Sequence, residues 1–183
     1  MKKIKSLFQR HYHGNRQVYN EVVPGSEWVI DGKGTATQKH DGTCCLIENG
    51  EFFKRYEVKK GKTPPPKFVP ATDFDPNTGK QQGWVPVGSE PEDQYHREGF
   101  EALVHKEDGT YELCGPKVQG NPENLDRHIL IRHGSVVFSH TPRDFDGIKR
   151  WLDNYDVEGV VWHHPDGRMV KIKKSDFGLK RSA

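Results

Sequence analysis

The chain has 183 residues, of which 32% are hydrophobic and 30% charged, and its nine Phe, six Tyr and four Trp exclude a disordered chain. The formal net charge is only +2, which excludes recognition of a nucleic acid by the electrostatic field of the whole protein. A nucleic acid would have to be bound by a local basic groove instead. Three cysteines are too few for a disulfide framework, and no stretch of about 20 apolar residues could span a membrane. The chain also opens without a leader, so we expect one reduced, cytoplasmic module.

The N-terminal part is polar as far as a Pro24-Gly25 break, so we expect residues 1–26 to form an N-terminal arm. The next segment, Trp28-Val29-Ile30, is predicted to be a strand. A β-rich stretch then runs to Val58. The Asn49-Gly50 pair inside this stretch is a strong signal for a hairpin with a two-residue turn.

The middle of the chain is rich in proline between residues 61 and 88 and shows little periodicity, which predicts an exposed connection. Residues 91–103 are predicted to form a helix, and residues 111–114 a short strand. One or two further strands are expected between residues 128 and 138.

The C-terminal part is predicted to hold a helix and a hairpin. Thr141-Pro142 followed by Asp144 is a good helix start, because proline fits the first turn and an acid favours the positive end of the helix dipole. This helix should run to about Tyr155. The two segments that flank Asp166-Gly167 are then predicted to pair as a hairpin.

Alternation along that hairpin predicts which side chains share a face. With a two-residue turn, Trp162 lies opposite Lys171 and Val160 lies opposite Lys173. One side then carries Glu158, Trp162, Lys171 and Lys173, and the other carries Val161, Val170 and Ile172. Charged side chains gathered over an apolar side predict a ligand-binding cleft, although a solvent-facing sheet with ordinary lysines fits the same pattern.

The most informative segment is Gln38-Lys39-His40-Asp41-Gly42-Thr43, which follows one strand and opens a hairpin. By itself a Lys-x-Asp-Gly motif fits a solvated lysine at a turn. Further segments, however, occur in the order and rough spacing of the motifs of covalent nucleotidyltransferases, the ligases and capping enzymes that charge a lysine with a nucleotide. These segments hold Arg55, Glu112, Glu158-Gly159-Val160-Val161 and Lys171-Ile172-Lys173. The chain therefore resembles this superfamily.

Two segments narrow the resemblance. Residues 53–61 and 111–117 look like the ATP-dependent 5′-3′ RNA ligase 1 family, and the similarity covers roughly residues 28–174. The resemblance implies a single nucleotidyltransferase domain over residues 1–183, with an α+β fold. Its antiparallel sheets would form a nucleotide-binding cleft, as in the ATP-grasp-like adenylyltransferase domain of ligases. Because about ten residues follow Lys173, we expect no C-terminal oligonucleotide-binding (OB) domain, which favours an RNA ligase over DNA ligases and capping enzymes.

The resemblance also implies a reaction in three steps. Lys39 attacks ATP and becomes lysyl-AMP, the adenylyl group passes to the 5′-phosphate of RNA, and a 3′-hydroxyl then displaces AMP. A lysine amine is a nucleophile only when it is unprotonated, so Lys171 and Lys173 are expected to favour that form by their charge while they hold the α-phosphate. Mg²⁺ or Mn²⁺ is expected to neutralise the phosphates, with Glu158 as its first candidate ligand and Glu112 as its second.

The remaining site residues are assigned by resemblance. Arg55 should contact the ribose, and Glu112 the ribose or a metal-bound water. Gln38 should contact the adenine edge, and Phe138 is the candidate for stacking on the base, although its apolar surroundings in the sequence fit a core residue as well. Asp41-Gly42 is expected to support the loop after Lys39.

Other chemistry is less well supported. The histidine pairs His163-His164 and His11 with His13 lack the spacing of a zinc site, and no base arrangement accompanies the three cysteines. Two rival functions stay open: a related enzyme that uses GTP or DNA ends, and a catalytically inactive protein that binds RNA ends. The expected partners are ATP and RNA with 5′-phosphate and 3′-hydroxyl ends, without an obligate protein partner.

Overall fold

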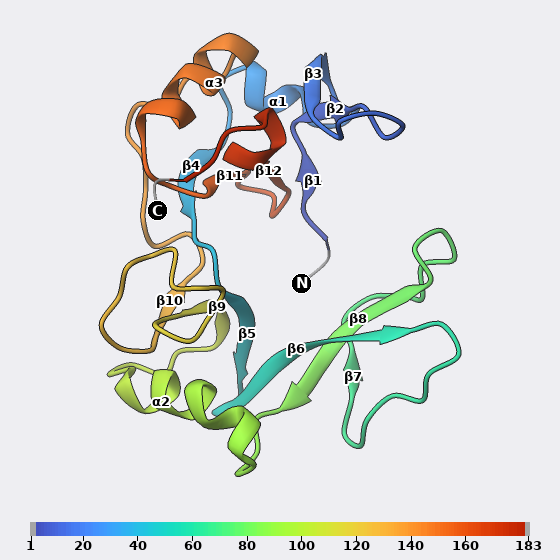
Figure 1. The fold of residues 1–183 in the computed structure, drawn as a ribbon, viewed down its shortest axis with the longest axis vertical. Helices are drawn as coiled ribbons and strands as arrows, with labels where there is room; N and C mark the ends of the chain where they lie inside the picture. Colours follow the sequence, from blue (N-terminus) through green and yellow to red (C-terminus); the bar gives the residue numbers. More distant parts are fainter. Residues whose placement is uncertain (1–2, 182–183) are drawn as a thin grey trace. The chain divides into compact units, whose positions relative to one another are not determined.

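The computed structural model describes residues 3–181, which form an α+β fold with many strands and few, short helices (Figure 1). The chain forms two compact units. Unit 1 holds residues 41–133, and unit 2 holds residues 3–40 and 134–181. The expected single domain over 1–183 stays a prediction. None of the helices within residues 3–181 combines the length and the apolar composition that crossing a bilayer requires.

Unit 1 is built on a six-stranded antiparallel sheet in the order β10-β9-β5-β6-β8-β7. Its strands are β5 (Thr43–Glu48), β6 (Glu51–Lys59), β7 (Val69–Pro70), β8 (Lys80–Pro86), β9 (Gly109–Cys114) and β10 (Ile129–Arg132). The hairpin predicted at Asn49-Gly50 joins β5 to β6, and both turn residues have positive φ, 52° and 77°. The strands predicted within 111–114 and 128–138 are confirmed as β9 and β10.

The proline-rich segment 61–88 was expected to be an exposed connection, but it contains β7 and β8. The prediction is wrong for β8, which pairs with β6 along its full length. The weak hydrophobic pattern of this segment did not indicate a strand, because β8 forms by pairing with the long strand β6 rather than through local alternation. At Gly83 a Cβ would lie only 2.3 Å from the ring of Phe68, so glycine allows that ring to pack on the strand.

The predicted helix over 91–103 is present as the 3₁₀ turn η1 (Pro91–Asp93) and α2 (Gln94–Ala102). Phe100 of α2 stacks on Phe52 at 4.7 Å between ring centroids. The helix thus covers one face of the sheet, and the core on that face consists of Cys45, Ile47, Phe52, Tyr111, Leu113, Val118 and Leu130.

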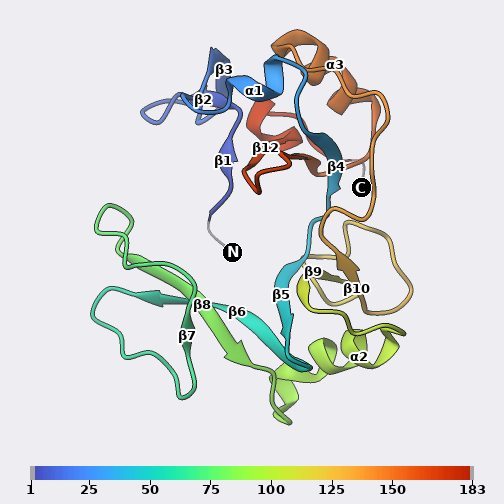
Figure 2. The same ribbon diagram turned by 180° about the vertical axis from the view of Figure 1, so that it is seen from behind.

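Unit 2 contains a four-stranded sheet in the order β1-β12-β11-β4. Its strands are β1 (Lys5–Ser6), β12 (Met169–Lys173), β11 (Gly159–His163) and β4 (Thr35–Lys39). Strand β1 runs parallel to β12 and lies beside it in both views (Figures 1 and 2), whereas the other pairs are antiparallel. A separate hairpin is formed by β2 (Phe8–Arg10) and β3 (Val18–Val22). The helices α1 (Glu27–Ile30) and α3 (Phe145–Asn154) and the 3₁₀ turn η2 (Lys174–Phe177) complete the unit.

The residues expected to form an N-terminal arm, 1–26, are part of unit 2 from Lys3 onward. Leu7 and Phe8 are almost fully buried in its core, and Ser6 pairs with β12. This segment is therefore integrated into the core packing and the sheet.

The strand predicted at residues 28–30 is wrong, because Glu27–Ile30 forms the short helix α1. Trp28 and Val29 are adjacent and both buried. A strand would point neighbouring side chains to opposite faces, whereas a helical turn can bury both. Glu27 favours the helix as well, since its carboxylate accepts the Gly25 amide at 2.8 Å.

The helix predicted after Thr141-Pro142 is confirmed as α3 (Phe145–Asn154). It begins later than the proline, because Asp144 is the N-cap and its carboxylate accepts the amide of Gly147 at 2.8 Å. Ile148 and Leu152, one turn apart on α3, are fully buried in the core of unit 2.

The predicted C-terminal hairpin is present, but its register differs by one residue from the prediction. Val161, and not Trp162, lies opposite Lys171. The turn is longer than two residues, because the amide of His164 still donates to the carbonyl of Arg168 at 2.9 Å. A slip of one residue moves each side chain to the other face, so Trp162 is fully buried in the core instead of lining a cleft.

Candidate functional site

Three lysines gather on one face of the unit 2 sheet. Gly159 in the central strand β11 lies opposite Lys39 of β4 on one side and opposite Lys173 of β12 on the other. Residues directly opposite each other share a face, and Lys171 shares the face of Lys173 because it lies two positions before it. The core residues Val160, Trp162, Val170 and Ile172 occupy the opposite face.

Gly159 is the residue that lets the strands meet closely between these lysines. A Cβ at this position would lie 2.1 Å from the carbonyl oxygen of Ile172 and 2.9 Å from Cα of Lys173. A side chain would therefore separate β11 from β12 at the point where Lys173 leaves the sheet.

Glu158 brings a negative charge to the lysine face. Its Oε2 accepts a hydrogen bond from Nζ of Lys39 at 2.6 Å, and the two side chains are 16% and 22% exposed. Glu158 precedes β11 and its carbonyl oxygen accepts the amide of Lys174 at 2.8 Å. Because Glu158 lies in the bend before the strand, its carboxylate reaches the lysine face although strict alternation would place it on the core side.

Lys171 is the lysine with the clearest electrostatic perturbation. Burial lowers its pKa, and the nearby positive charges of Lys39 and Lys173 lower it further, against the opposing effect of Asp176 and Glu158. Desolvation and like charges both disfavour an ammonium group. A bound anion would relieve this repulsion, so the lysine face is suited to an anionic ligand.

The end of β12 carries additional positive charge. The buried carboxylate of Asp176 accepts the backbone amide of Lys173 at 2.8 Å and the guanidinium of Arg10 at 2.6 Å. Arg10, Arg16 and Lys173 line the same hollow in unit 2. The N-terminal hairpin thus brings two arginines close to Lys173, a contribution that the sequence did not suggest.

Gln38 and Phe138 lie away from the lysine face. Gln38 precedes Lys39 in β4 and pairs with Val160, so alternation turns it to the other side of the strand. Its amide nitrogen is 3.3 Å from Nδ1 of His40. Phe138 packs edge-on against Trp151, with ring centroids 5.0 Å apart, at the border of the unit 2 core. Their predicted contacts with adenine stay predictions.

Arg55 and Glu112 lie on one face of the unit 1 sheet, opposite the face that α2 covers. Phe53 of β6 lies opposite Leu46 of β5, and Cys44 of β5 lies opposite Glu112 of β9. Arg55 shares the face of Phe53, and Cys44 shares the face of Leu46, because each is two positions away. The two predicted ribose contacts are thus brought to the same face.

Both side chains are held by neighbours within unit 1. Nε of Arg55 donates to Oε1 of Gln82 at 3.1 Å, and its guanidinium lies 4.9 Å from the ring centroid of Trp84. Oε1 of Glu112 accepts the amide of Gly42 at 3.1 Å. A Cβ at Gly42 would lie 3.0 Å from Cγ of Glu112 and 2.1 Å from a backbone oxygen, so glycine is required at this contact.

The backbone of Asp41 is anchored as well, since its amide donates to Oε1 of Glu123 at 2.9 Å.

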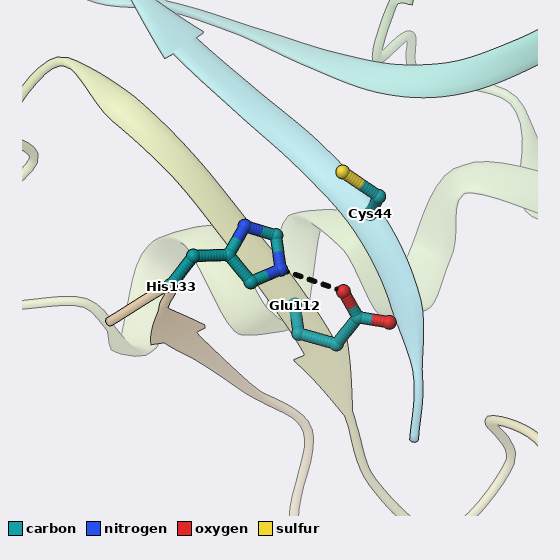
Figure 3. Close-up of side chains that lie close together, drawn as sticks. All are labelled: Cys44, Glu112 and His133. Carbon is teal, nitrogen blue, oxygen red and sulfur yellow. Dashed lines mark hydrogen bonds and ion pairs between the residues drawn. The ribbon is translucent and has the colours of Figure 1, made fainter. Parts of the chain in front are cut away.

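A further cluster joins Glu112 to Cys44 and His133 (Figure 3), and the sequence did not reveal it. These residues come from three different strand segments, so no short spacing could indicate their proximity.

Comparison with known proteins finds similarity to RNA ligase 1. A family model described as RNA ligase 1 matches residues 97–183. RNA ligase 1 of Danio rerio is 38% identical over 80 residues, a match that covers 39% of this chain and 25% of that protein. RNA ligase 1 of Mus musculus is 26% identical, over 84% of this chain and 71% of the mouse protein. This chain is similar to RNA ligase 1.

The similarity to RNA ligase 1 confirms the resemblance drawn from residues 53–61 and 111–117. The matches span part of each relative, from 25% of the zebrafish protein to 71% of the mouse protein. The family model covers β9 to β12 and includes Glu112, Glu158, Lys171 and Lys173.

Proposed function

We propose that this chain is an ATP-dependent RNA ligase that joins 5′-phosphate and 3′-hydroxyl RNA ends through a lysyl-AMP intermediate on Lys39. The observation that carries the proposal is the placement of Lys39 beside Glu158 and on one sheet face with Lys171 and Lys173. The relatives named RNA ligase 1 support RNA as the substrate.

In the first step, the unprotonated Nζ of Lys39 attacks the α-phosphorus of ATP. A phosphorus–nitrogen bond forms, the bond to pyrophosphate breaks, and the amine loses its proton. In the second step, a 5′-phosphate oxygen of RNA displaces Lys39 and takes over the adenylyl group. In the third step, a 3′-hydroxyl attacks the activated 5′-phosphate, and AMP leaves as the new phosphodiester forms.

Lys171 and Lys173 stabilise the charge that builds on the phosphates during the first step. Lys171 is the better suited to contact the α-phosphate, because an anion there offsets the repulsion and the burial that lower its pKa. Arg10 and Arg16, which share a hollow with Lys173, extend the positive charge beyond the sheet.

Arg55 is proposed to bind the ribose, and Glu112 the ribose or a metal-bound water. Their common face of the unit 1 sheet supports a joint role, and a carboxylate with an arginine can bind two hydroxyl groups by hydrogen bonds. Gln38 and Phe138 are retained as proposed contacts of the adenine, although their present neighbours are His40 and Trp151.

The residues around Lys39 fit a Mg²⁺ ion that arrives with the triphosphate. Mg²⁺ in such sites takes one or two carboxylates together with substrate phosphates and water, and Glu158 is the carboxylate on the lysine face that would hold it. When bound, the ion would neutralise the phosphate oxygens and the leaving group. A Glu158 carboxylate engaged in this way no longer pairs with Lys39, which frees the amine for attack.

A joining assay tests the function. A nicked or single-stranded RNA with a labelled 5′-phosphate and a free 3′-hydroxyl is incubated with ATP and Mg²⁺, and the adenylylated strand and the joined strand are resolved by electrophoresis. We expect both species with ATP and RNA. Joining that requires GTP or DNA ends would replace the proposal by a related nucleotidyltransferase. RNA binding without either species would indicate an inactive end-binding protein.

A further inference from the structure

A thiol, an imidazole and a carboxylate converge on the unit 1 sheet (Figure 3). Cys44 lies in β5, Glu112 lies opposite it in β9, and His133 directly follows β10. One ligand atom from each of the three lies within 4.8 Å of the others. Nε2 of His133 is 2.8 Å from Oε2 of Glu112, so two of the three donors already touch.

The chemistry of these donors identifies the ion they fit. Thiolate and imidazole are ligands of Zn²⁺ and similar transition metals, whereas Mg²⁺ takes oxygen ligands and water. Zinc sites with three protein ligands keep a fourth position for water or substrate. We propose that Cys44, Glu112 and His133 form a binding site for Zn²⁺ or a similar soft divalent cation, distinct in ligand type from the Mg²⁺ site proposed at Glu158.

The distances between the donors suit this proposal. Tetrahedral coordination with ordinary bond lengths places nitrogen, oxygen and sulfur ligands about 3.3–3.6 Å apart. Nε2 of His133 and Oε2 of Glu112 lie 2.8 Å apart, and all three donor atoms lie within 4.8 Å of one another. The three donor atoms therefore lie close enough together to share one ion.

The residues behind the donors are those that orient metal ligands. Nδ1 of His133 is 2.9 Å from Oγ1 of Thr110, which leaves Nε2 directed at Glu112. The other oxygen of Glu112 accepts the amide of Gly42. Hydrogen bonds of this kind fix the ring and carboxylate of metal-bound residues, and their loss usually weakens metal binding by about 10–100-fold.

Charge balance also favours a divalent ion at this position. A thiolate from Cys44 and the carboxylate of Glu112 carry two negative charges, and a neutral His133 adds none, so one divalent cation gives a neutral site. Neutrality matters because Glu112 is only 12% exposed and His133 is 24% exposed.

Cobalt provides a direct probe, because a thiolate bound to Co²⁺ produces a charge-transfer band that histidine and carboxylate ligands do not. The full chain is titrated with Co²⁺, without ATP or RNA, so the outcome is independent of whether the chain ligates RNA. We expect the band in the unmodified chain and its displacement by Zn²⁺. Absence of the band would overturn the proposal, even if exposed histidines bind cobalt.

Two variants assign the band to this cluster. Cys44→Ser should abolish it, whereas Cys45→Ala removes the neighbouring thiol on the opposite, buried face and should retain it. Thr110→Val keeps all three ligands and should weaken Co²⁺ binding by about 10–100-fold. A band that survives in Cys44→Ser, or is lost in Cys45→Ala while that variant stays folded by circular dichroism, would contradict the assignment.

Discussion

Nζ of Lys39 lies 2.6 Å from Oε2 of Glu158, although the two residues are 119 positions apart in the chain. The antiparallel pairing of β4 with β11 brings them together, because Gly159 lies opposite Lys39. The carboxylate holds the lysine side chain in place on the face that also carries Lys171 and Lys173. A ligand that engages Glu158 would release the amine of Lys39.

Glu158→Gln should slow formation of lysyl-AMP by about 100-fold, the usual effect of losing one group that stabilises charge in the reaction. Glutamine keeps the shape of the side chain and a hydrogen-bond acceptor, but it loses the negative charge that pairs with Lys39 and would hold Mg²⁺. The rate of adenylylation under single-turnover conditions measures the effect. A rate of adenylylation that is unchanged at limiting Mg²⁺ would reject the role assigned to Glu158.

Lys173→Ala should reduce the same rate by about 100-fold while the protein remains folded, since this lysine is proposed to bind phosphate rather than to support the core. Lys149→Ala is the matched control, because Lys149 lies exposed on α3 in the same unit. Equal rates for the two variants would show that Lys173 acts only as a surface charge.

Lys171→Met should raise the stability of the protein against urea at neutral pH. Because burial and neighbouring lysines lower the pKa of Lys171, the unfolded chain binds more protons than the folded chain between that lowered value and the ordinary value of 10.5. The stability of the unmodified protein therefore rises with pH through this window, and the advantage of the variant should shrink there. A variant that is less stable at neutral pH would contradict the electrostatic account.

Trp162→Ala should lower the free energy of unfolding by about 3–5 kcal/mol, because the indole is fully buried in the unit 2 core. This result also tests the register of the C-terminal hairpin. A tryptophan on the lysine face would give a much smaller loss, so a change below about 1 kcal/mol would favour the register predicted from the sequence over the observed one.

Much of the fold follows from local signals in the sequence. Asn49-Gly50 indicated a hairpin, and both positions adopt positive φ. Thr141-Pro142 followed by Asp144 indicated a helix start, and in the structure Asp144 is the N-cap of α3. The motif residues Lys39, Lys171 and Lys173 were singled out by their resemblance to a known family, and the structure places these three on one face.

The errors have a common physical origin in tertiary contacts. The register of the hairpin around Trp162 depends on which side chains the core can bury, and a one-residue difference in turn length was enough to reverse the faces. Strand β8 depends on pairing with β6. The cluster of Cys44, Glu112 and His133 depends on three strands that are separated in the sequence, so no spacing rule could detect it.

The most direct test of the central claim is the intact mass of the protein after incubation with ATP and Mg²⁺. We expect the unmodified chain to gain the mass of one adenylyl group, and Lys39→Arg to gain none, because a guanidinium keeps the positive charge but does not lose its proton. Lys54→Arg is the matched control, since Lys54 is 21% exposed, similar to Lys39 at 22%, and also pairs with one carboxylate, that of Asp93. This control should gain the full mass. An adenylyl group on Lys39→Arg, or none on the unmodified chain, would contradict the account.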